Sequence, residues 1–310
     1  LKIQPSEFAK FTTGLALAKF FNMQHVNSQK HTTRILSYLI VLVPCLLIIL
    51  QNDLGTALVF LSFILVLYRE GLSINILFAI LILGILCLLS LLISQKILIY
   101  FFSFLALVSL LFFRFNKKDI LTIIICWGFS VFFVLGTNFF VNDILSPHHT
   151  KRINVLLGKE FDPYGAGYNL IQSKIAIGSG GSFGKGFLNG TQTRFDFVPE
   201  QSTDFIFCTI GEEWGFFGSL LFILIFIGLI TRIILLAERQ RSSFSRIYGY
   251  SVACILFSHF TINIGMTIGL LPTVGIPLPF ISYGGSSLLG FTILLFIFLN
   301  LDSYRLDILR

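Results

Sequence analysis

Long apolar runs follow one another along almost the whole chain, and a single polar stretch, residues 142–204, interrupts them. A helix needs about 20 residues, at ~1.5 Å each, to cross the ~30 Å hydrocarbon core of a bilayer. These runs are apolar on every face, whereas the strands of a membrane barrel would alternate. The pattern therefore predicts an all-α polytopic membrane protein with about nine transmembrane or half-membrane helices and one long extracytoplasmic loop. The predicted segments are 8–22, 35–50, 54–68, 72–94, 97–113, 120–141, 205–231, 247–271 and 286–301.

The composition supports this fold class. Hydrophobic residues make up 55% of the chain and charged residues only 12%, whereas about a quarter of the residues of a soluble protein are charged. The formal charge is +7, but the basic residues are spread over short loops, which favours membrane topology and anionic lipid contact over nucleic acid binding. The five cysteines lie in or beside apolar runs without a pairing motif, so we interpret them as packing residues.

Basic loops tend to stay in the cytoplasm, and residues 232–246, with four arginines, form the clearest such loop. Residues 142–204 then lie outside. Alternating the sides along the chain places residues 4–7, 51–53 and 272–285 outside as well, with Lys96 as the one basic residue on the wrong side. We therefore expect separated polar motifs to converge on one membrane face.

Asp204 ends the polar stretch and directly precedes an apolar run. At helical spacing, Cys208 and Glu212 follow on the same face, so two carboxylates would line one side of a helix. Two interpretations of Asp204 remain open. It is either a general base at the membrane edge or, like Ser202 and Thr203, a residue that caps the helix.

A second pair of charges, Glu7 and Lys10, lies three residues apart after Pro5 and would share a helix face. Such a pair either neutralises itself for structural reasons or faces a functional cavity. His259 and Asn263, four residues apart in an apolar segment, are expected to serve interhelical packing.

Two stretches are rich in glycine or proline. Residues 176–186 are not a Walker motif, because the spacing fails and Gly186 replaces Ser or Thr. Their glycines either expose N–H groups to an anion, with Lys185 among the nearby cations, or allow a tight turn. Residues 271–287 contain three prolines and three glycines, so they cannot form a regular helix and must be buried in protein or line a cavity.

Five ordered motifs resemble the RodA/FtsW family of polytopic peptidoglycan glycosyltransferases, also called SEDS proteins. Residues 172–181, 184–186 and 190–192 are more similar to the RodA, or cell-elongation, branch. The motifs that carry the resemblance are 4–10, 52–57, 165–186, 198–205 and 277–286.

The resemblance implies polymerisation of lipid II, an undecaprenyl pyrophosphate-linked disaccharide pentapeptide, on the outer face of the bacterial cytoplasmic (inner) membrane. Asp204 matches the essential acid of the family, and its implied role is that of general base for the acceptor hydroxyl. Glu7 and Lys10 match the charged pair of the first motif and are implied to lie in the same outward cavity.

Further substrate-binding residues are assigned less directly. Charge alone suggests Arg152 and Lys174 for the pyrophosphate, and we add Glu200 and Ser282 from two of the matched motifs. No cofactor and no metal ligand set are visible, although a divalent cation at the pyrophosphate would be compatible with the chemistry.

The family resemblance also implies a class B penicillin-binding protein as partner. Two other functions stay open: a transporter (flippase) of the lipid-linked precursor, and a non-catalytic scaffold for the penicillin-binding protein. Polar motifs on one side only, without an inverted repeat, favour the enzyme over the transporter.

The chain departs from the family pattern in two places. It begins just before the first strong motif, so we expect about three N-terminal family spans to be missing. It also has three apolar runs between residues 71 and 151 where the family usually has one, which predicts an extra helical hairpin within 72–118. We otherwise predict one membrane domain over 1–310, with 142–204 as its catalytic loop.

Overall fold

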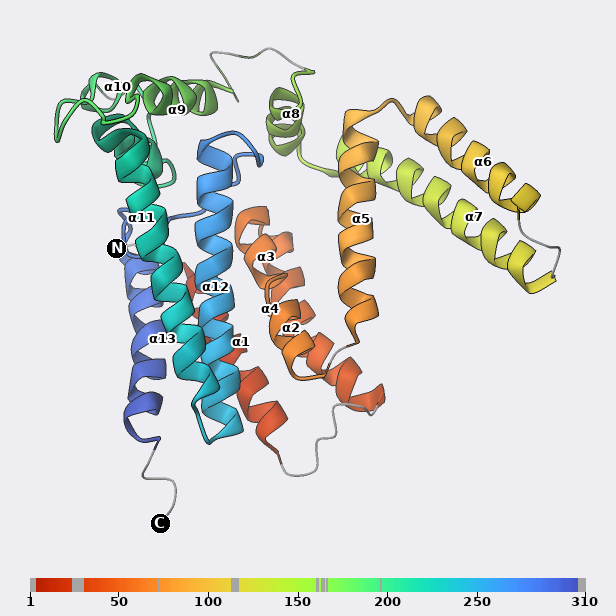
Figure 1. Cartoon of the computed structure of the whole chain (residues 1–310), viewed down its shortest axis with the longest axis horizontal. Helices are drawn as coiled ribbons and strands as arrows, with labels where there is room; N and C mark the ends of the chain where they lie inside the picture. Colours follow the sequence, from red (N-terminus) through yellow and green to blue (C-terminus); the bar gives the residue numbers. More distant parts are fainter. Residues whose placement is uncertain are drawn as a thin grey trace. The chain divides into compact units, whose positions relative to one another are not determined.

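The structure is a computed structural model that describes residues 4–23, 31–71, 73–112, 117–159, 162, 165, 167–195 and 197–305. All regular elements in these ranges are helices (Figure 1), as predicted. They are α1 (Pro5–Asn22), α2 (His31–Leu50), α3 (Leu54–Phe60), α4 (Phe63–Arg69), α5 (Ile74–Leu92), α6 (Gln95–Phe112), α7 (Lys117–Phe139), the π-helix η1 (Phe140–Ile144), α8 (Pro147–Leu156), α9 (Tyr168–Ser179), α10 (Thr191–Arg194), α11 (Ile206–Glu238), α12 (Ser243–Thr267) and α13 (Gly285–Ser303).

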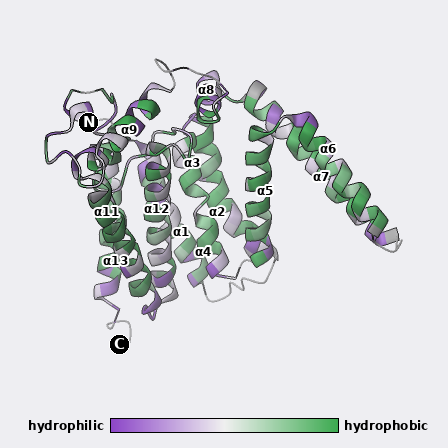
Figure 2. Ribbon diagram, turned by 45° about the horizontal axis from the view of Figure 1, so that its top comes forward, coloured by the Kyte–Doolittle hydropathy of each residue, from purple (hydrophilic) through white to green (hydrophobic). Residues whose placement is uncertain are grey.

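Each predicted apolar run corresponds to helix. The run 54–68 is split into α3 and α4 by a turn at Leu61 and Ser62, and α11 continues seven residues beyond the predicted end, to Glu238. Six of the described helices are long and apolar enough to cross a membrane, and hydrophobic residues make up much of the helical ribbon in Figure 2. The prediction of a polytopic all-α membrane protein is confirmed.

The chain folds into two compact units, residues 1–73 with 167–310 and residues 74–166. In the second unit α7 packs against both α5 and α6, and Trp127 Nε1 donates a hydrogen bond of 3.1 Å to Ser103 Oγ across the α6–α7 contact. The three runs expected here are therefore three helices, although residues 72 and 113–116 of the proposed hairpin lie outside the described residues. That this hairpin is added to the family pattern, and that 1–310 acts as a single domain, stay predictions.

Helix α12 is the centre of the first unit. It packs against α1, α3, α4, α9, α11 and α13. Within the apolar stretch of α12 that could cross a membrane, 78% is buried inside the protein. The corresponding share is 28% in α2, α11 and α13. An apolar helix covered on all sides offers its polar side chains only to other protein groups, so polar residues on α12 are expected to bind neighbouring elements.

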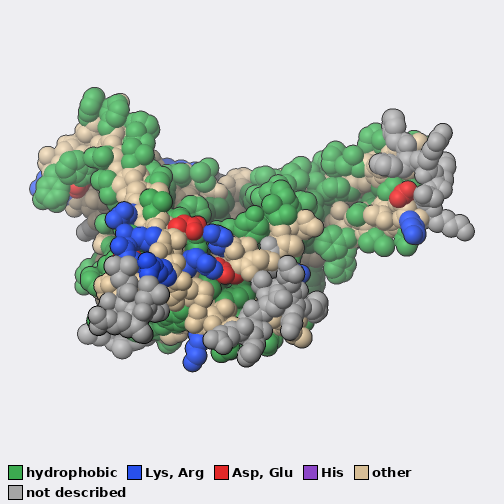
Figure 3. Space-filling model, turned by 60° about the horizontal axis from the view of Figure 1, so that its bottom comes forward, with side chains coloured by type: hydrophobic (Ala, Val, Ile, Leu, Met, Phe, Trp, Pro, Cys, Tyr) green, Lys and Arg blue, Asp and Glu red, His purple; other side chains and the backbone are tan. Residues whose placement is uncertain are grey.

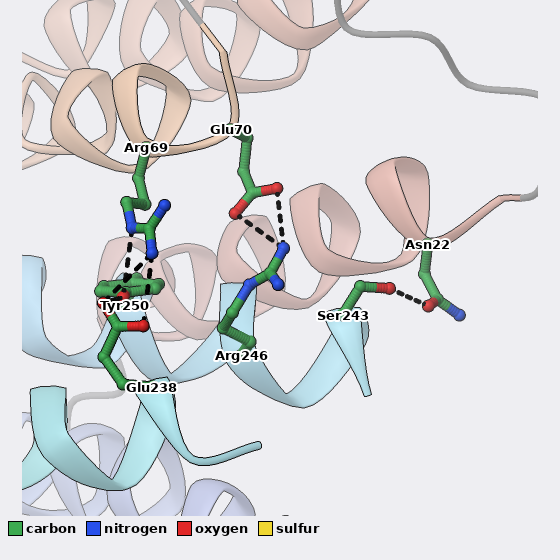
Figure 4. A network of polar contacts seen from close by, with 7 residues as sticks. All are labelled: Asn22, Arg69, Glu70, Glu238, Ser243, Arg246 and Tyr250. Carbon is green, nitrogen blue, oxygen red and sulfur yellow. Dashed lines mark hydrogen bonds and ion pairs between the residues drawn. The ribbon is translucent and has the colours of Figure 1, made fainter. Parts of the chain in front are cut away.

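One end of the first unit carries a network of ion pairs, shown in Figure 4. Arg69 of α4 pairs with Glu238 of α11 at 3.2 Å, and Arg246 of α12 pairs with Glu70 at 3.3 Å. Tyr250 also donates to Glu238. Lys and Arg side chains gather with several acids on the face turned forward in Figure 3. Part of the basic charge used to assign topology therefore also joins the helix ends.

At the opposite end, α11 is kinked at Gly215 (φ 65°, ψ −160°). A kink leaves helix carbonyls and N–H groups without their usual partners. The glycine-rich loop that follows α9 supplies them. The four hydrogen bonds run from Lys185 N to Glu212 O (3.0 Å), Gly186 N to Glu213 O (3.0 Å), Phe216 N to Gly181 O (2.9 Å) and Phe217 N to Ser182 O (3.1 Å).

This contact requires glycine. A Cβ at Gly180 would lie 2.1 Å from Gly211 O, and one at Gly184 would lie 2.1 Å from Glu213 O. The backbone of the loop therefore packs directly against the backbone of the kinked helix. Two of the N–H groups that an anion would need are already bonded to α11, which argues against the phosphate-cradle interpretation.

We predict that Gly180→Ala lowers the free energy of unfolding by about 1–3 kcal/mol, because the added methyl group forces two backbones apart. Gly178→Ala is the matched control, since nothing lies within 4 Å of a Cβ at that position. Thermal unfolding in detergent compares the two variants. Equal melting temperatures would show that the loop does not depend on this close approach.

Candidate functional site

Asp204 lies in the turn 201–205 that leads into α11. The helix starts at Ile206, and its N-cap residue is Phe205, which makes no side-chain cap hydrogen bond. Asp204, one residue earlier, is therefore not the N-cap residue of α11, and its side chain is half-buried.

The backbone of this turn is held by α12. Asn263, which is fully buried, donates from Nδ2 to Asp204 O at 2.7 Å and to Ile276 O at 2.6 Å. Ile276 belongs to the irregular segment between α12 and α13, which we define as residues 268–284. A Cβ at Gly275, where φ is +69°, would lie 3.3 Å from Asp204 Oδ2. One amide thus holds the turn beside the irregular segment, and the carboxylate lies against that segment.

Ser282 makes a second connection between the same two parts. Its hydroxyl donates to Thr203 O and accepts from Leu278 N at 2.8 Å. Next to it, Tyr283 N donates to Ser202 O at 2.8 Å. Ser282 was predicted to bind substrate, but its hydroxyl group holds the backbone next to Asp204.

Glu7 and Lys10 form a buried ion pair of 2.7 Å, with their side chains 2% and 3% exposed. Lys10 Nζ also lies 2.8 Å from His259 Nε2 and 4.9 Å from the centroid of the Phe291 ring. His259 Nδ1 is 3.1 Å from Pro277 O. A carbonyl can only accept, so Nδ1 carries the proton and Nε2 accepts from the ammonium group of Lys10. Each contact from Glu7 through Lys10 and His259 to Pro277 then joins one donor to one acceptor.

The pair therefore has a structural role that the sequence left open. It joins α1 to α12 and, through His259, to the irregular segment. The charged atoms of Glu7 and Lys10 already have partners inside the protein. Through His259, the pair supports the irregular segment. His259 and Asn263 likewise bind backbone carbonyls of that segment and are not simple interhelical packing residues.

The first two motifs also meet at this end of the unit. Gln4 Nε2 donates to Asp53 Oδ2 at 3.0 Å, and Asp53 caps α3 through Thr56 N at 2.9 Å. A Cβ at Gly55 would lie 2.5 Å from Val274 O of the irregular segment. The predicted convergence of the separated polar motifs is thus found in the first unit.

Among the other predicted site residues, Lys174 and Glu200 are exposed, and Arg152 belongs to the second unit. Lys174 on α9 is exposed, and its ammonium group is next to Gly269, where a Cβ would be 2.4 Å from Nζ. Glu200 is exposed and accepts from Thr203 Oγ1 at 2.7 Å. Arg152 belongs to α8 in the second unit, where its guanidinium lowers the pKa of His148. It is not among the residues that the first unit brings together around Asp204.

Glu212 has a role that the sequence did not reveal. Its carboxylate is fully buried and accepts from Lys185 Nζ at 2.7 Å, Gln192 N at 2.9 Å and Thr193 N at 2.9 Å. It therefore holds the first turn of α10 and Lys185 of the preceding loop, and it is not a second acid for Asp204. Lys185 is also removed as a candidate phosphate ligand, since its charge is paired. Among the described residues, no group of three or more His, Cys, Asp or Glu is placed to hold a metal ion.

Comparison with known proteins places the chain in a family. A model of the FtsW/RodA/SpoVE family, described as cell cycle proteins, matches residues 1–105 and 93–306. The chain belongs to this family. The peptidoglycan glycosyltransferase MrdB of Escherichia coli K12 is 37% identical over 290 residues, which cover 93% of this chain and 65% of MrdB. The peptidoglycan glycosyltransferase RodA of Treponema pallidum is 33% identical, over 92% of this chain and 71% of that protein.

Solved structures of the family share the fold. One, from a peptidoglycan synthase complex that coordinates polymerization and crosslinking, matches with a TM-score of 0.67 and 27% identity over 99% of this chain and 71% of that one. The rod shape determining protein RodA of Thermus thermophilus matches with a TM-score of 0.56 and 21% identity, over 99% and 67%. The chain thus has the FtsW/RodA/SpoVE fold, and it spans 65% of the length of the E. coli relative.

We predict strong coupling between Glu7 and Lys10. Glu7→Gln or Lys10→Met alone should lower the free energy of unfolding by about 3–5 kcal/mol, because each leaves a buried partner unpaired. The double variant should cost clearly less than the sum.

Unfolding in mixed micelles measures this cycle, and the half-exposed pair Arg69–Glu238 is the matched control, with expected coupling below about 1 kcal/mol. Additive effects at Glu7 and Lys10 would contradict the assignment of a buried, mutually dependent pair.

Proposed function

We propose that the protein is a peptidoglycan glycosyltransferase that polymerises lipid II into glycan strands during cell elongation. Membership of the FtsW/RodA/SpoVE family and the names of its relatives in E. coli and T. pallidum support this. The observation that carries the proposal is the Asp204 turn. The Asp204 carboxylate lies beside an irregular segment, on backbone fixed by Asn263 and Ser282.

In the proposed reaction, Asp204 accepts the proton of the acceptor sugar hydroxyl. That oxygen attacks the anomeric carbon of the donor while the bond from this carbon to the pyrophosphate oxygen breaks. The electron pair leaves with the lipid pyrophosphate, and the configuration at the anomeric carbon inverts. Such catalysis requires a base held in place, and the hydrogen bonds from α12 and from Ser282 to the turn provide this.

For the pyrophosphate we propose Lys174, which is exposed in the unit that carries Asp204 and lies next to Gly269 of the irregular segment. Its ammonium group supplies the positive charge that phosphate oxygens bind. A divalent cation would add to this charge. Glu200, exposed on the same turn as Asp204, is proposed to contact the sugars, while Glu7 and Lys10 support the segment opposite the base.

We further propose that Asp204 faces the outside of the bacterial cytoplasmic membrane. The ion-pair network and its arginines lie at the end of the first unit opposite to the turn, and basic ends tend to stay in the cytoplasm. A class B penicillin-binding protein is the proposed partner. This rests on the resemblance of the chain to one from a complex that coordinates polymerization and crosslinking.

The direct test is polymerisation of lipid II by the purified full-length protein with its penicillin-binding protein. Asp204→Asn should lower the rate by about 10²–10⁴-fold, since that is the usual contribution of a general base. Asp143→Asn removes an exposed carboxylate that has no role in the proposal and should leave the rate unchanged.

Undiminished polymer from Asp204→Asn would refute the catalytic assignment. Movement of lipid II across proteoliposomes without polymer would favour the transporter. Intact synthesis that requires the protein but not Asp204 would favour the scaffold.

A further inference from the structure

A pocket of about 270 Å³ lies beside the turn that carries Asp204. It is lined by Leu188 of the loop, residues 193–194 of α10, the turn residues 201–202, and Ile206, Thr209 and Glu213 of α11. The three α11 residues share one helix face, at spacings of three and four. The reaction proposed above does not use this pocket.

The consecutive residues Glu212 and Glu213 differ in their hydrogen-bond partners. Glu212 accepts hydrogen bonds from Lys185 and from backbone N–H groups. Glu213 is only 8% exposed, yet within the described part of the chain its carboxylate has neither a hydrogen bond nor an ion pair. Glu213 lines the pocket, so its carboxylate oxygens can be reached from there. Water or a bound ligand can supply their hydrogen-bond donors, and a ligand cation would also pair with the charge.

The same pocket contains an opposite charge. Arg194, the last residue of α10, lines it and is exposed. No ion pair joins Arg194 to Glu213 within 4.0 Å in the described structure. The pocket thus offers an anion at depth and a cation toward solvent, beside the apolar side chains of Leu188 and Ile206.

We propose that this pocket binds a zwitterionic group, with a primary ammonium against the Glu213 carboxylate and an anionic part near the Arg194 guanidinium. Thr193, Ser202 and Thr209 also line the pocket, and a hydroxyl group can both donate and accept a hydrogen bond.

Two molecules carry this chemistry. One is a phospholipid whose head group has an ammonium and a phosphate. The exposed Phe187 and Trp214, with ring centroids 6.5 Å apart, lie next to the pocket residues in sequence and are of the type that occupies the membrane interface. The other is the peptide of the lipid-linked substrate, which carries amino and carboxylate groups, and this second source rests on the proposed function.

Carbodiimide cross-linking tests the pocket without requiring turnover. The reagent joins a carboxylate to a primary amine that touches it, with loss of the carboxyl oxygen to the urea by-product. The full-length protein is placed in nanodiscs of phosphatidylethanolamine, or in nanodiscs of phosphatidylglycerol with lipid II whose peptide amine is free. Mass spectrometry of the peptide that contains Glu213 then identifies the adduct.

We expect a lipid or a substrate adduct on Glu213, which names the source, and none with phosphatidylglycerol alone or with amine-acetylated substrate. Glu213→Gln should abolish the adduct. Arg194→Gln should weaken it about tenfold, the effect of ~1.4 kcal/mol.

Absence of adduct in both arms overturns the proposal, provided that glycine ethyl ester, added last, labels the exposed Asp143. An adduct that does not change in Arg194→Gln overturns the zwitterionic assignment. Loss of polymerisation with cross-linking intact would instead count against the proposed function alone.

Discussion

Backbone that leaves the helical conformation inside a membrane protein must find hydrogen-bond partners within the protein, because hydrocarbon offers none. The irregular segment 268–284 meets this requirement through α12. His259 donates to Pro277 O, and Asn263 donates to Ile276 O. Two polar side chains, one turn apart on the most buried helix of the first unit, thus support a segment that could not otherwise exist at this depth.

The other features of the site depend on this support. The second donor hydrogen of the Asn263 amide holds the turn that carries Asp204, and the free nitrogen of His259 accepts from Lys10, which is neutralised by Glu7. The kink of α11 obeys the same rule, since the glycine-rich loop satisfies the backbone groups that Gly215 frees. Polar residues buried in this unit therefore serve mainly to stabilise irregular backbone, including the turn that carries Asp204.

The sequence was sufficient for the fold class, because apolar runs of bilayer length admit few alternatives. The nine runs and the irregular character of 271–287 were predicted from hydropathy and from proline and glycine alone. The sequence did not predict the partners of the individual polar residues. Glu212 was grouped with Asp204 from helical spacing, but Asp204 precedes the helix and Glu212 binds the first turn of α10. Ser282 was assigned to substrate, and the glycine-rich loop was left open between an anion site and a tight turn. Both make backbone contacts with segments far away in the sequence. Such pairings depend on tertiary contacts that local patterns do not contain.

The support of irregular backbone by α12 is tested most directly by amide hydrogen exchange in nanodiscs after Asn263→Leu. The variant keeps the side-chain size but leaves the carbonyls of Asp204 and Ile276 without a donor, at a cost of about 1–3 kcal/mol. Exchange in residues 201–205 and 275–283 should rise by roughly 5- to 150-fold. The control Asn138→Leu, whose amide bonds only within its own helix, should leave both segments unchanged. Equal exchange in the two variants would contradict the account, since it would mean that the turn and the irregular segment are held by other contacts.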